Sequence, residues 1–97
     1  MDIPLSLAAQ IAALGEEYGA ERIVLFGSRA RGDNSERSDI DLAVFGLSDG
    51  AAVPFCFALD DLPTLLKFDV AVVHDSTDAR FLKKIERDGV TLYGKDS

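Results

Sequence analysis

The segment Ile23–Phe45, which reads IVLFGSRARGDNSERSDIDLAVF, decides the fold of this chain because two apolar runs flank a polar turn within it. The first run predicts a β-strand over Arg22–Phe26 that ends at a glycine. The second run predicts a strand over Asp39–Phe45 whose apolar side chains alternate along one face. The residues between them, 28–38, are too polar for a strand and leave room for a single helical turn.

The polar residues of this segment are of the kinds that bind phosphate and metal. Gly27 has no Cβ to keep a phosphate away from the backbone, and Ser28 adds a hydroxyl. The short turn after them can aim backbone N–H groups at an anion. Asp39 and Asp41 are two residues apart and so share one face of a strand, where their like charges repel. A divalent cation reverses the sign of that cost, so the pattern predicts a metal–triphosphate site.

A third aspartate opens another apolar run. Residues 68–74, FDVAVVH, predict a strand whose β-branched composition is typical of a central position in a sheet. Asp69 costs free energy near the start of such a strand unless something satisfies it, so it joins the candidate site. His74 ends the same strand, and we interpret it as a structural residue.

The rest of the chain predicts three helices and a last strand. Helices are expected over residues 4–18, 51–62 and 77–88, with a strand over 90–93. Pro54 is expected in the first turn of the second helix, and Asp75–Thr77 offers an N-cap to the third. The order predicts one α+β domain over residues 1–97, with a mixed sheet of about four strands.

Charge and composition exclude several classes of protein. The net charge of −7 argues against a polynucleotide substrate, because nucleic-acid-binding domains usually present a basic face. No apolar run approaches the roughly 20 residues that span a membrane. A lone Cys56 and a start without a basic segment favour the cytoplasm. We expect one group of cations to surround the phosphate turn: Arg22, Arg29, Arg31 and Arg37.

The wording FGSRARG, followed by SDIDLAV and later by FDVAVV, resembles the nucleotidyltransferase superfamily that includes DNA polymerase β. The small size and the closing run Gly-Val-Thr-Leu-Tyr are similar to its minimal (MNT) branch, which includes the MntA-like antitoxins of HEPN/MNT toxin–antitoxin systems. The resemblance covers nearly the whole chain and is weakest over residues 47–66. It implies a DNA polymerase β-like nucleotidyltransferase fold, two Mg²⁺ ions as cofactors and ATP as substrate.

The resemblance also implies a role for each matching residue. The β- and γ-phosphates of the nucleotide would be held by Gly27 and Ser28, with a charge-assisted contact from Arg31. Catalysis and the binding of both Mg²⁺ ions would fall to three aspartates: Asp39, Asp41 and Asp69. The third of these would also orient or deprotonate the acceptor hydroxyl.

The acceptor is a separate question. The resemblance implies an antitoxin that transfers AMP to a tyrosine of a HEPN-domain ribonuclease toxin, with the acceptor surface supplied by another polypeptide or a second copy of the chain. Two alternatives stay open at the level of sequence. One is a protein that neutralises its partner by binding alone, and the other is a nucleotidyltransferase that acts on a small molecule.

Overall fold

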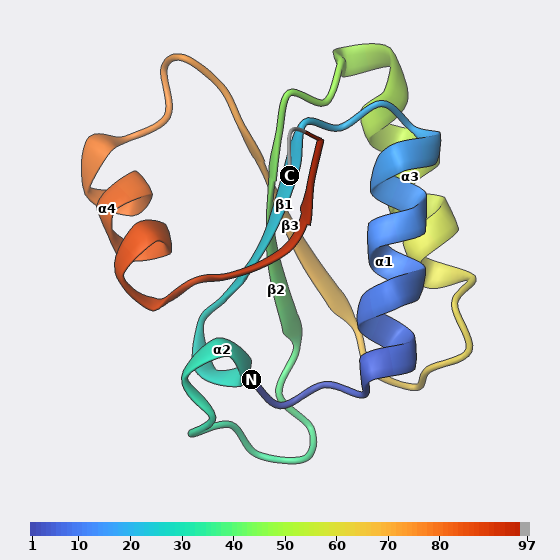
Figure 1. Ribbon diagram of the computed structural model, residues 1–97, viewed down its shortest axis with the longest axis vertical. Coiled ribbons are helices and arrows are strands. Elements are labelled where there is room, and N and C mark those ends of the chain that lie inside the picture. The colour runs from blue at the N-terminus through green and yellow to red at the C-terminus, as the bar shows by residue number, and fades with distance from the viewer. Residues whose placement is uncertain (96–97) are drawn as a thin grey trace.

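Eight helices and strands follow one another along residues 1–95, the part of the chain that the computed structural model describes (Figure 1). In chain order they are α1 (Leu5–Glu17), β1 (Arg22–Phe26), α2 (Ser28–Arg31), β2 (Ile40–Phe45), α3 (Asp49–Asp60), β3 (Phe68–Val73), α4 (Ala79–Asp88) and β4 (Val90–Gly94). The order confirms the predicted succession of elements, including the single helical turn after the first strand.

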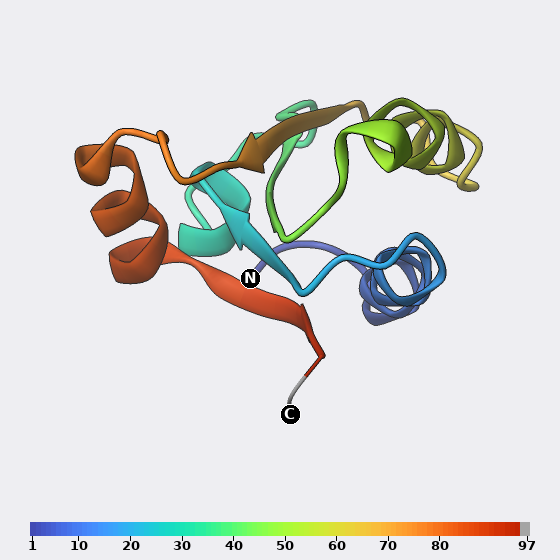
Figure 2. The same ribbon diagram turned by 90° about the horizontal axis from the view of Figure 1, so that it is seen from above.

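The four strands form one mixed sheet in the order β3-β2-β1-β4. β2 and β3 are parallel, while β1 pairs antiparallel with both β2 and β4. α1 and α3 lie side by side on one face of this sheet, and α4 lies on the other (Figures 1 and 2). This arrangement confirms the predicted α+β class with one mixed sheet.

The alternation of β2 supplies both faces of the sheet. Ile40, Leu42 and Val44 are fully buried in the core beneath α1 and α3. Each such side chain contributes about 1.5–3 kcal/mol to folding by leaving water. The residues between them face α4, where Ala43 packs in a smaller cluster with Ile85. The strand therefore holds the two layers together, and its second residue, Asp41, belongs to the α4 face.

The prediction of a central position for the third strand is wrong. β3 lies at one edge of the sheet and pairs with β2. Its apolar composition has another cause: Phe68, Val70 and Val72 pack against the core under α1 and α3, and Val73 packs on the α4 side. The strand ends before His74, which is exposed and whose N–H donates to Thr77 Oγ1 at 2.8 Å.

Two details of the helices also differ from prediction. α3 begins at Asp49, which places Pro54 in its second turn, although a proline ring removes a hydrogen bond there. The N-cap of α4 is Asp78, whose side chain accepts from the N–H of Arg80 at 2.8 Å. Among the described residues, no helix is both long and apolar enough to cross a membrane.

Candidate active site

The sheet brings Asp41 and Asp69 together. The parallel register of β2 and β3 places the two residues directly beside each other, although 27 positions separate them in sequence. Leu42 and Val70, the next residue after each aspartate, face the core under α1 and α3. Side chains alternate along a strand, so both aspartates face α4. Asp39 lies one residue before β2 and is exposed. The three predicted aspartates therefore lie at one end of the sheet, where the charges of Asp39 and Asp69 act on Asp41.

Asp41 carries the electrostatic cost of this arrangement. Partial burial is the largest cause that raises the pKa of its carboxyl, followed by the negative charges of Asp69 and Asp39. Two cations, Lys84 and Arg31, act in the opposite direction but do not reverse the shift. The carboxylates are thus held close enough to repel one another, and added positive charge between them would be favourable.

Gly27 packs directly against this carboxylate. β1 and β2 pair so that Phe26 lies opposite Asp41, and Gly27 is the next residue of the chain. A Cβ on Gly27 would collide with the Asp41 carboxylate. Its φ of +73° and ψ of −156° also belong to a region that only glycine adopts readily. Both constraints explain why glycine is needed at the end of the strand.

The helical turn α2 starts at this glycine. The N–H groups of Ala30 and Arg31 both donate to the carbonyl of Gly27, each at 3.2 Å. The first N–H groups of a helical turn have no acceptor within it, so they remain available to a ligand. Within residues 1–95 the Ser28 hydroxyl also has no hydrogen-bond partner. The start of the turn therefore offers several donors beside the carboxylate of Asp41.

Arg31 lies at the end of the same turn. Its Nε donates to Asp33 Oδ2 at 3.1 Å, and its Nη1 lies 3.9 Å from Oδ2 of Asp88 on α4. Its side chain keeps 40% of its surface exposed, and its charge reaches Asp41. Arg31 thus stands at the site with part of its guanidinium open to solvent.

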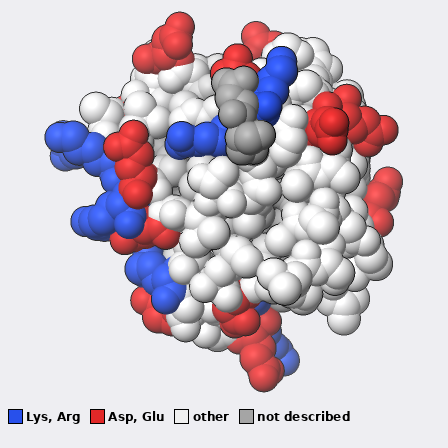
Figure 3. Space-filling model, viewed as in Figure 1, with Lys and Arg blue, Asp and Glu red and all other residues white. Residues whose placement is uncertain are grey.

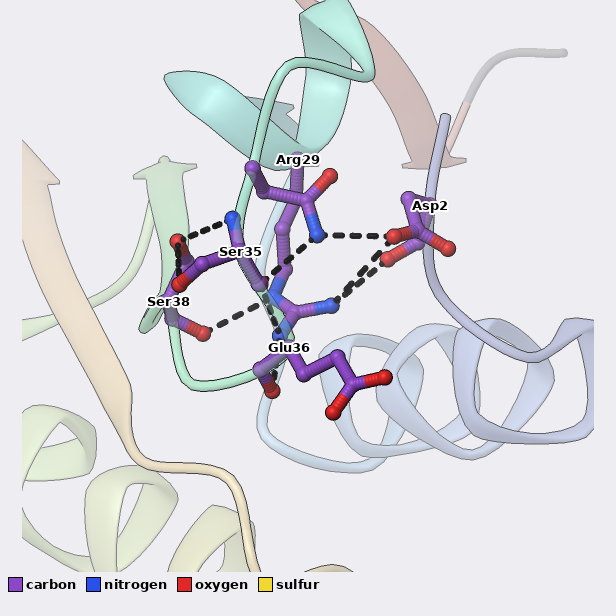
Figure 4. A network of polar contacts seen from close by, with 6 residues as sticks. Asp2, Arg29, Ser35, Glu36 and Ser38 are labelled. Atoms are coloured by element: carbon purple, nitrogen blue, oxygen red, sulfur yellow. Dashed lines mark hydrogen bonds and ion pairs between the residues drawn. The ribbon is translucent and has the colours of Figure 1, made fainter.

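Arg29 has a different role from the one that the sequence predicts. It is 4% exposed, and its guanidinium donates to backbone carbonyls of the loop that leads into β2 (Figure 4). Nε bonds the Ser38 carbonyl at 2.8 Å, and Nη2 bonds that of Glu36 at 3.1 Å. Nη1 bonds the Asp2 carbonyl at 2.9 Å. The side chain therefore fixes the loop that ends at Asp39, and its charge is committed to that loop.

Arg22 lies far along β1 from the phosphate turn. It opens β1, at the opposite end of the strand from Gly27, and its guanidinium lies over the ring of Phe45 at 4.3 Å. The prediction that four arginines surround the turn is therefore wrong for Arg22 and Arg29, and Arg37 lies outside the turn, in the loop before β2 beside Asp39.

Sequence reasoning missed the contribution of α4. Lys84 lies close enough to lower the pKa of Asp41, and Asp88 pairs with Arg31. The basic side chains of this helix gather on one side of the molecule (Figure 3). The charged residues of the helix predicted over 77–88, which include Lys83, Lys84 and Arg87, were the available signal, but they could not show that the helix packs on the face that carries Asp41.

The donor set fits a hard cation that a substrate helps to hold. Among residues 1–95 no three acidic, histidine or cysteine side chains form a complete ligand set by themselves. Magnesium in phosphate-transfer sites is typically bound through one or two carboxylates together with substrate phosphates. Asp39, Asp41 and Asp69 supply only oxygen donors, and the start of α2 supplies N–H groups for phosphate.

Comparison with known proteins agrees with this geometry. A family model described as Polymerase beta, Nucleotidyltransferase matches residues 9–97. A chain in a crystal structure of a toxin–antitoxin with AMP-PNP is 25% identical, with a TM-score of 0.68, over 91% of this chain and 73% of that chain. A chain from a mutant of the toxin–antitoxin MntA–HpeT is 23% identical, with a TM-score of 0.67 over the same shares, and shows a common fold. No curated protein matches the chain.

These findings confirm the resemblance inferred from FGSRARG and SDIDLAV, and with it the expected fold. The family model covers all four strands and the whole candidate site. This chain therefore belongs to the polymerase β family of nucleotidyltransferases.

Proposed function

We propose that this chain is a Mg²⁺-dependent protein adenylyltransferase that transfers AMP from ATP to a tyrosine of a HEPN-domain ribonuclease toxin, and so acts as its antitoxin. Family membership supports nucleotidyl transfer in general. The similarity to chains from toxin–antitoxin structures, one of them with AMP-PNP, supports the partner class and the nucleotide.

One observation carries the proposal. Asp41 and Asp69 lie side by side on adjacent strands, and Gly27 packs against the carboxylate of Asp41 at the start of a helical turn. A turn that offers hydrogen-bond donors, next to two neighbouring aspartates, suits a triphosphate whose negative charge is neutralised by bound cations. A structural role alone would not account for two carboxylates held together against their repulsion.

The transfer that we propose joins the acceptor oxygen to the α-phosphorus and breaks the bond from that phosphorus to the oxygen that bridges it to the β-phosphate. Pyrophosphate leaves, and Asp69 takes the proton of the acceptor hydroxyl before passing it to solvent. Gly27, Ser28 and Arg31 would hold the leaving phosphates, while Asp39, Asp41 and Asp69 would hold the cations. Bound Mg²⁺ would neutralise the triphosphate and the attacking oxygen.

The site's surroundings favour a protein as the acceptor. Asp39 and Asp69 are both exposed, so the carboxylates are open to a large partner on one side. The acidic chain offers no long basic track for a polynucleotide. A basic, RNA-cutting toxin would in contrast complement the charge of −7.

The test is to incubate the chain with ATP, Mg²⁺ and a HEPN-domain toxin encoded in the same genome, and then to weigh that toxin by mass spectrometry. We expect added mass in whole AMP units on a tyrosine. The Asp39→Asn variant should add none, because it removes a cation ligand from an exposed position where folding does not depend on it.

The same experiment separates catalysis from binding. If the HEPN-domain toxin stays unmodified but is inhibited in a stable complex, the chain is an antitoxin that acts by contact. Equal inhibition by the wild type and by Asp39→Asn would lead to the same conclusion.

A further inference from the structure

A groove of about 430 Å³ opens beside Asp39. Two segments that lie far apart in the sequence form its walls, one before β2 and one before β3. Its lining residues are Glu36, Arg37, Asp39, Leu65, Leu66 and Lys67. The two segments are tied together because the N–H of Ile40 donates to the carbonyl of Lys67 at 2.8 Å. The two walls of the groove are therefore held together at the start of β2.

The order of the strands fixes where this groove lies relative to the phosphate turn. β1 is antiparallel to β2 and β3 is parallel to it, so the end of β1 and the starts of β2 and β3 meet at one end of the sheet. The turn at Gly27 follows β1, whereas Leu65–Lys67 precedes β3 on the other side of β2. The carboxylates that start β2 thus lie between the phosphate turn and the groove.

This position matters for an in-line displacement. The attacking oxygen and the leaving oxygen lie on opposite sides of the phosphorus. Under the function proposed above, pyrophosphate leaves toward the turn at Gly27. The acceptor must then approach from the side of β3, where the groove opens and where Asp39 is one of its walls.

Leu65 gives the groove an apolar anchor. Its exposure of 104% is the highest among the large apolar side chains of the described residues. Leu66 beside it is half-buried and packs against the core, so the backbone here is held in place. An exposed leucine on a fixed segment can cover an aromatic ring, while Arg37 and Lys67 can bind the carbonyl groups of an extended peptide.

We propose that this groove binds the acceptor segment of the partner protein, with the ring of its hydroxyl-bearing aromatic side chain against Leu65 and the hydroxyl directed past Asp39 to the nucleotide. The inference rests on the proposed function and adds to it the surface that selects the acceptor. Leu65 is then a specificity-determining residue, while the carboxylates and the phosphate turn serve any acceptor.

A second apolar surface offers a natural comparison. Val53 and Phe57 on α3 are 63% and 66% exposed and line a shallow pocket with Cys56. α3 lies over the core face of the sheet, away from the face that carries Asp41 and Asp69. A ligand on α3 could strengthen docking of a partner but could not bring a hydroxyl to the nucleotide.

The test uses N-acetyl-L-tyrosinamide as the probe. It is titrated into the ¹⁵N-labelled chain that holds Mg²⁺ and α,β-methylene-ATP, an analogue that cannot transfer AMP. We expect amide shifts at residues 36–39 and 65–67, and about tenfold weaker binding of the probe by Leu65→Ser, since most of the apolar contact is lost. Phe57→Ser is the matched control and should bind the probe as the wild type does.

Two measurements of nucleotide binding distinguish a failure of this inference from a failure of the proposed function. Leu65→Ser should bind α,β-methylene-ATP with unchanged affinity, and its KM for ATP should not change, whereas its kcat/KM for the partner protein should fall about tenfold. Shifts confined to Val53 and Phe57, or equal binding of the probe by Leu65→Ser and the wild type, would overturn the inference. Failure of the wild type to bind the analogue would instead contradict the proposed function. A titration of the probe without nucleotide would still show whether the groove binds it.

Discussion

The two faces of the sheet divide stability from chemistry. Beneath α1 and α3 the sheet packs a continuous apolar core that includes Leu42, Phe55 and Leu59. On the α4 face the buried cluster is small, and Asp41 and Asp69 lie on the same face beyond it. One strand, β2, serves both faces through simple alternation. A chain this small can therefore tolerate repelling carboxylates because the opposite face supplies most of the burial.

The largest expected effect on stability comes from the core face. Phe55→Ala removes a fully buried ring that packs edge-on against Tyr18, with ring centroids 6.0 Å apart. We expect a loss of about 3–5 kcal/mol in the free energy of unfolding, measured by urea denaturation. Val53→Ala on the same helix, 63% exposed, should change it by less than about 0.5 kcal/mol. A loss for Phe55→Ala as small as the loss for Val53→Ala would show that α3 is not part of the core.

The α4 face should show the reverse behaviour. Asp41→Asn is expected to lower the rate of AMP transfer by about 10²–10³-fold, because a charge that stabilises the transition state is lost. The melting temperature in metal-free buffer should stay the same or rise slightly, since repulsion from Asp69 and Asp39 is relieved. Asp61→Asn, at the exposed end of α3, should leave both quantities unchanged. A clear fall in melting temperature for Asp41→Asn would mean that this face also stabilises the fold.

Substitution of Arg29 should lower both stability and activity, because its buried hydrogen bonds hold a loop of the site. Arg29→Met leaves the carbonyls of Ser38 and Glu36 without their donor, at a cost of about 1–3 kcal/mol. The Mg²⁺ concentration for half-maximal transfer should rise as well, since Asp39 is no longer fixed. Arg31→Met is the matched control, with a change in stability below about 0.5 kcal/mol and a higher KM for ATP. Interchanged results for the two arginines would contradict these assignments.

The smallest effect is a dependence of stability on pH. Because the folded state raises the pKa of Asp41, it holds this proton more tightly than the unfolded chain does. The contribution of Asp41 to stability is therefore greatest below its unfolded pKa and falls as the pH rises toward the folded pKa. In metal-free buffer we expect the stability of Asp41→Asn relative to wild type to rise across this window, measured by urea denaturation at a series of pH values. A difference that stays constant with pH would mean that neither burial nor the neighbouring aspartates raise the pKa of Asp41 in the folded chain.

The sequence predicted the site's backbone positions well because local pattern determines them. Gly27 and the alternation from Ile40 to Phe45 specify a strand end and a two-faced strand without reference to the rest of the chain. Asp69 was harder to place, since its neighbour across the sheet depends on register, yet the apolar run around it was sufficient to place it in a strand.

The rest depended on tertiary contacts that no local pattern records. Arg29 and Arg31 are the same residue type two positions apart on one turn, but one is buried in carbonyls and the other faces the site. Lys84 could be assigned to a helix but not to a face of the sheet. The edge position of β3 was missed because its apolar residues reflect packing on two sides rather than two neighbouring strands.

The pairing of β1 has a consequence for the order in which the molecule is made. β1 lies between β2 and the last strand, β4, and Leu25 pairs with both Leu42 and Val90. A growing chain that has left the ribosome only as far as β2 has two strands, which are too few to be stable in water. The acidic pair needs β3, and closure of the second edge of β1 needs β4, which comes after β3 and α4 in the chain. We therefore expect the candidate site to be assembled only after β3 and β4 have left the ribosome, so that a nascent chain that ends before them lacks the neighbouring aspartates.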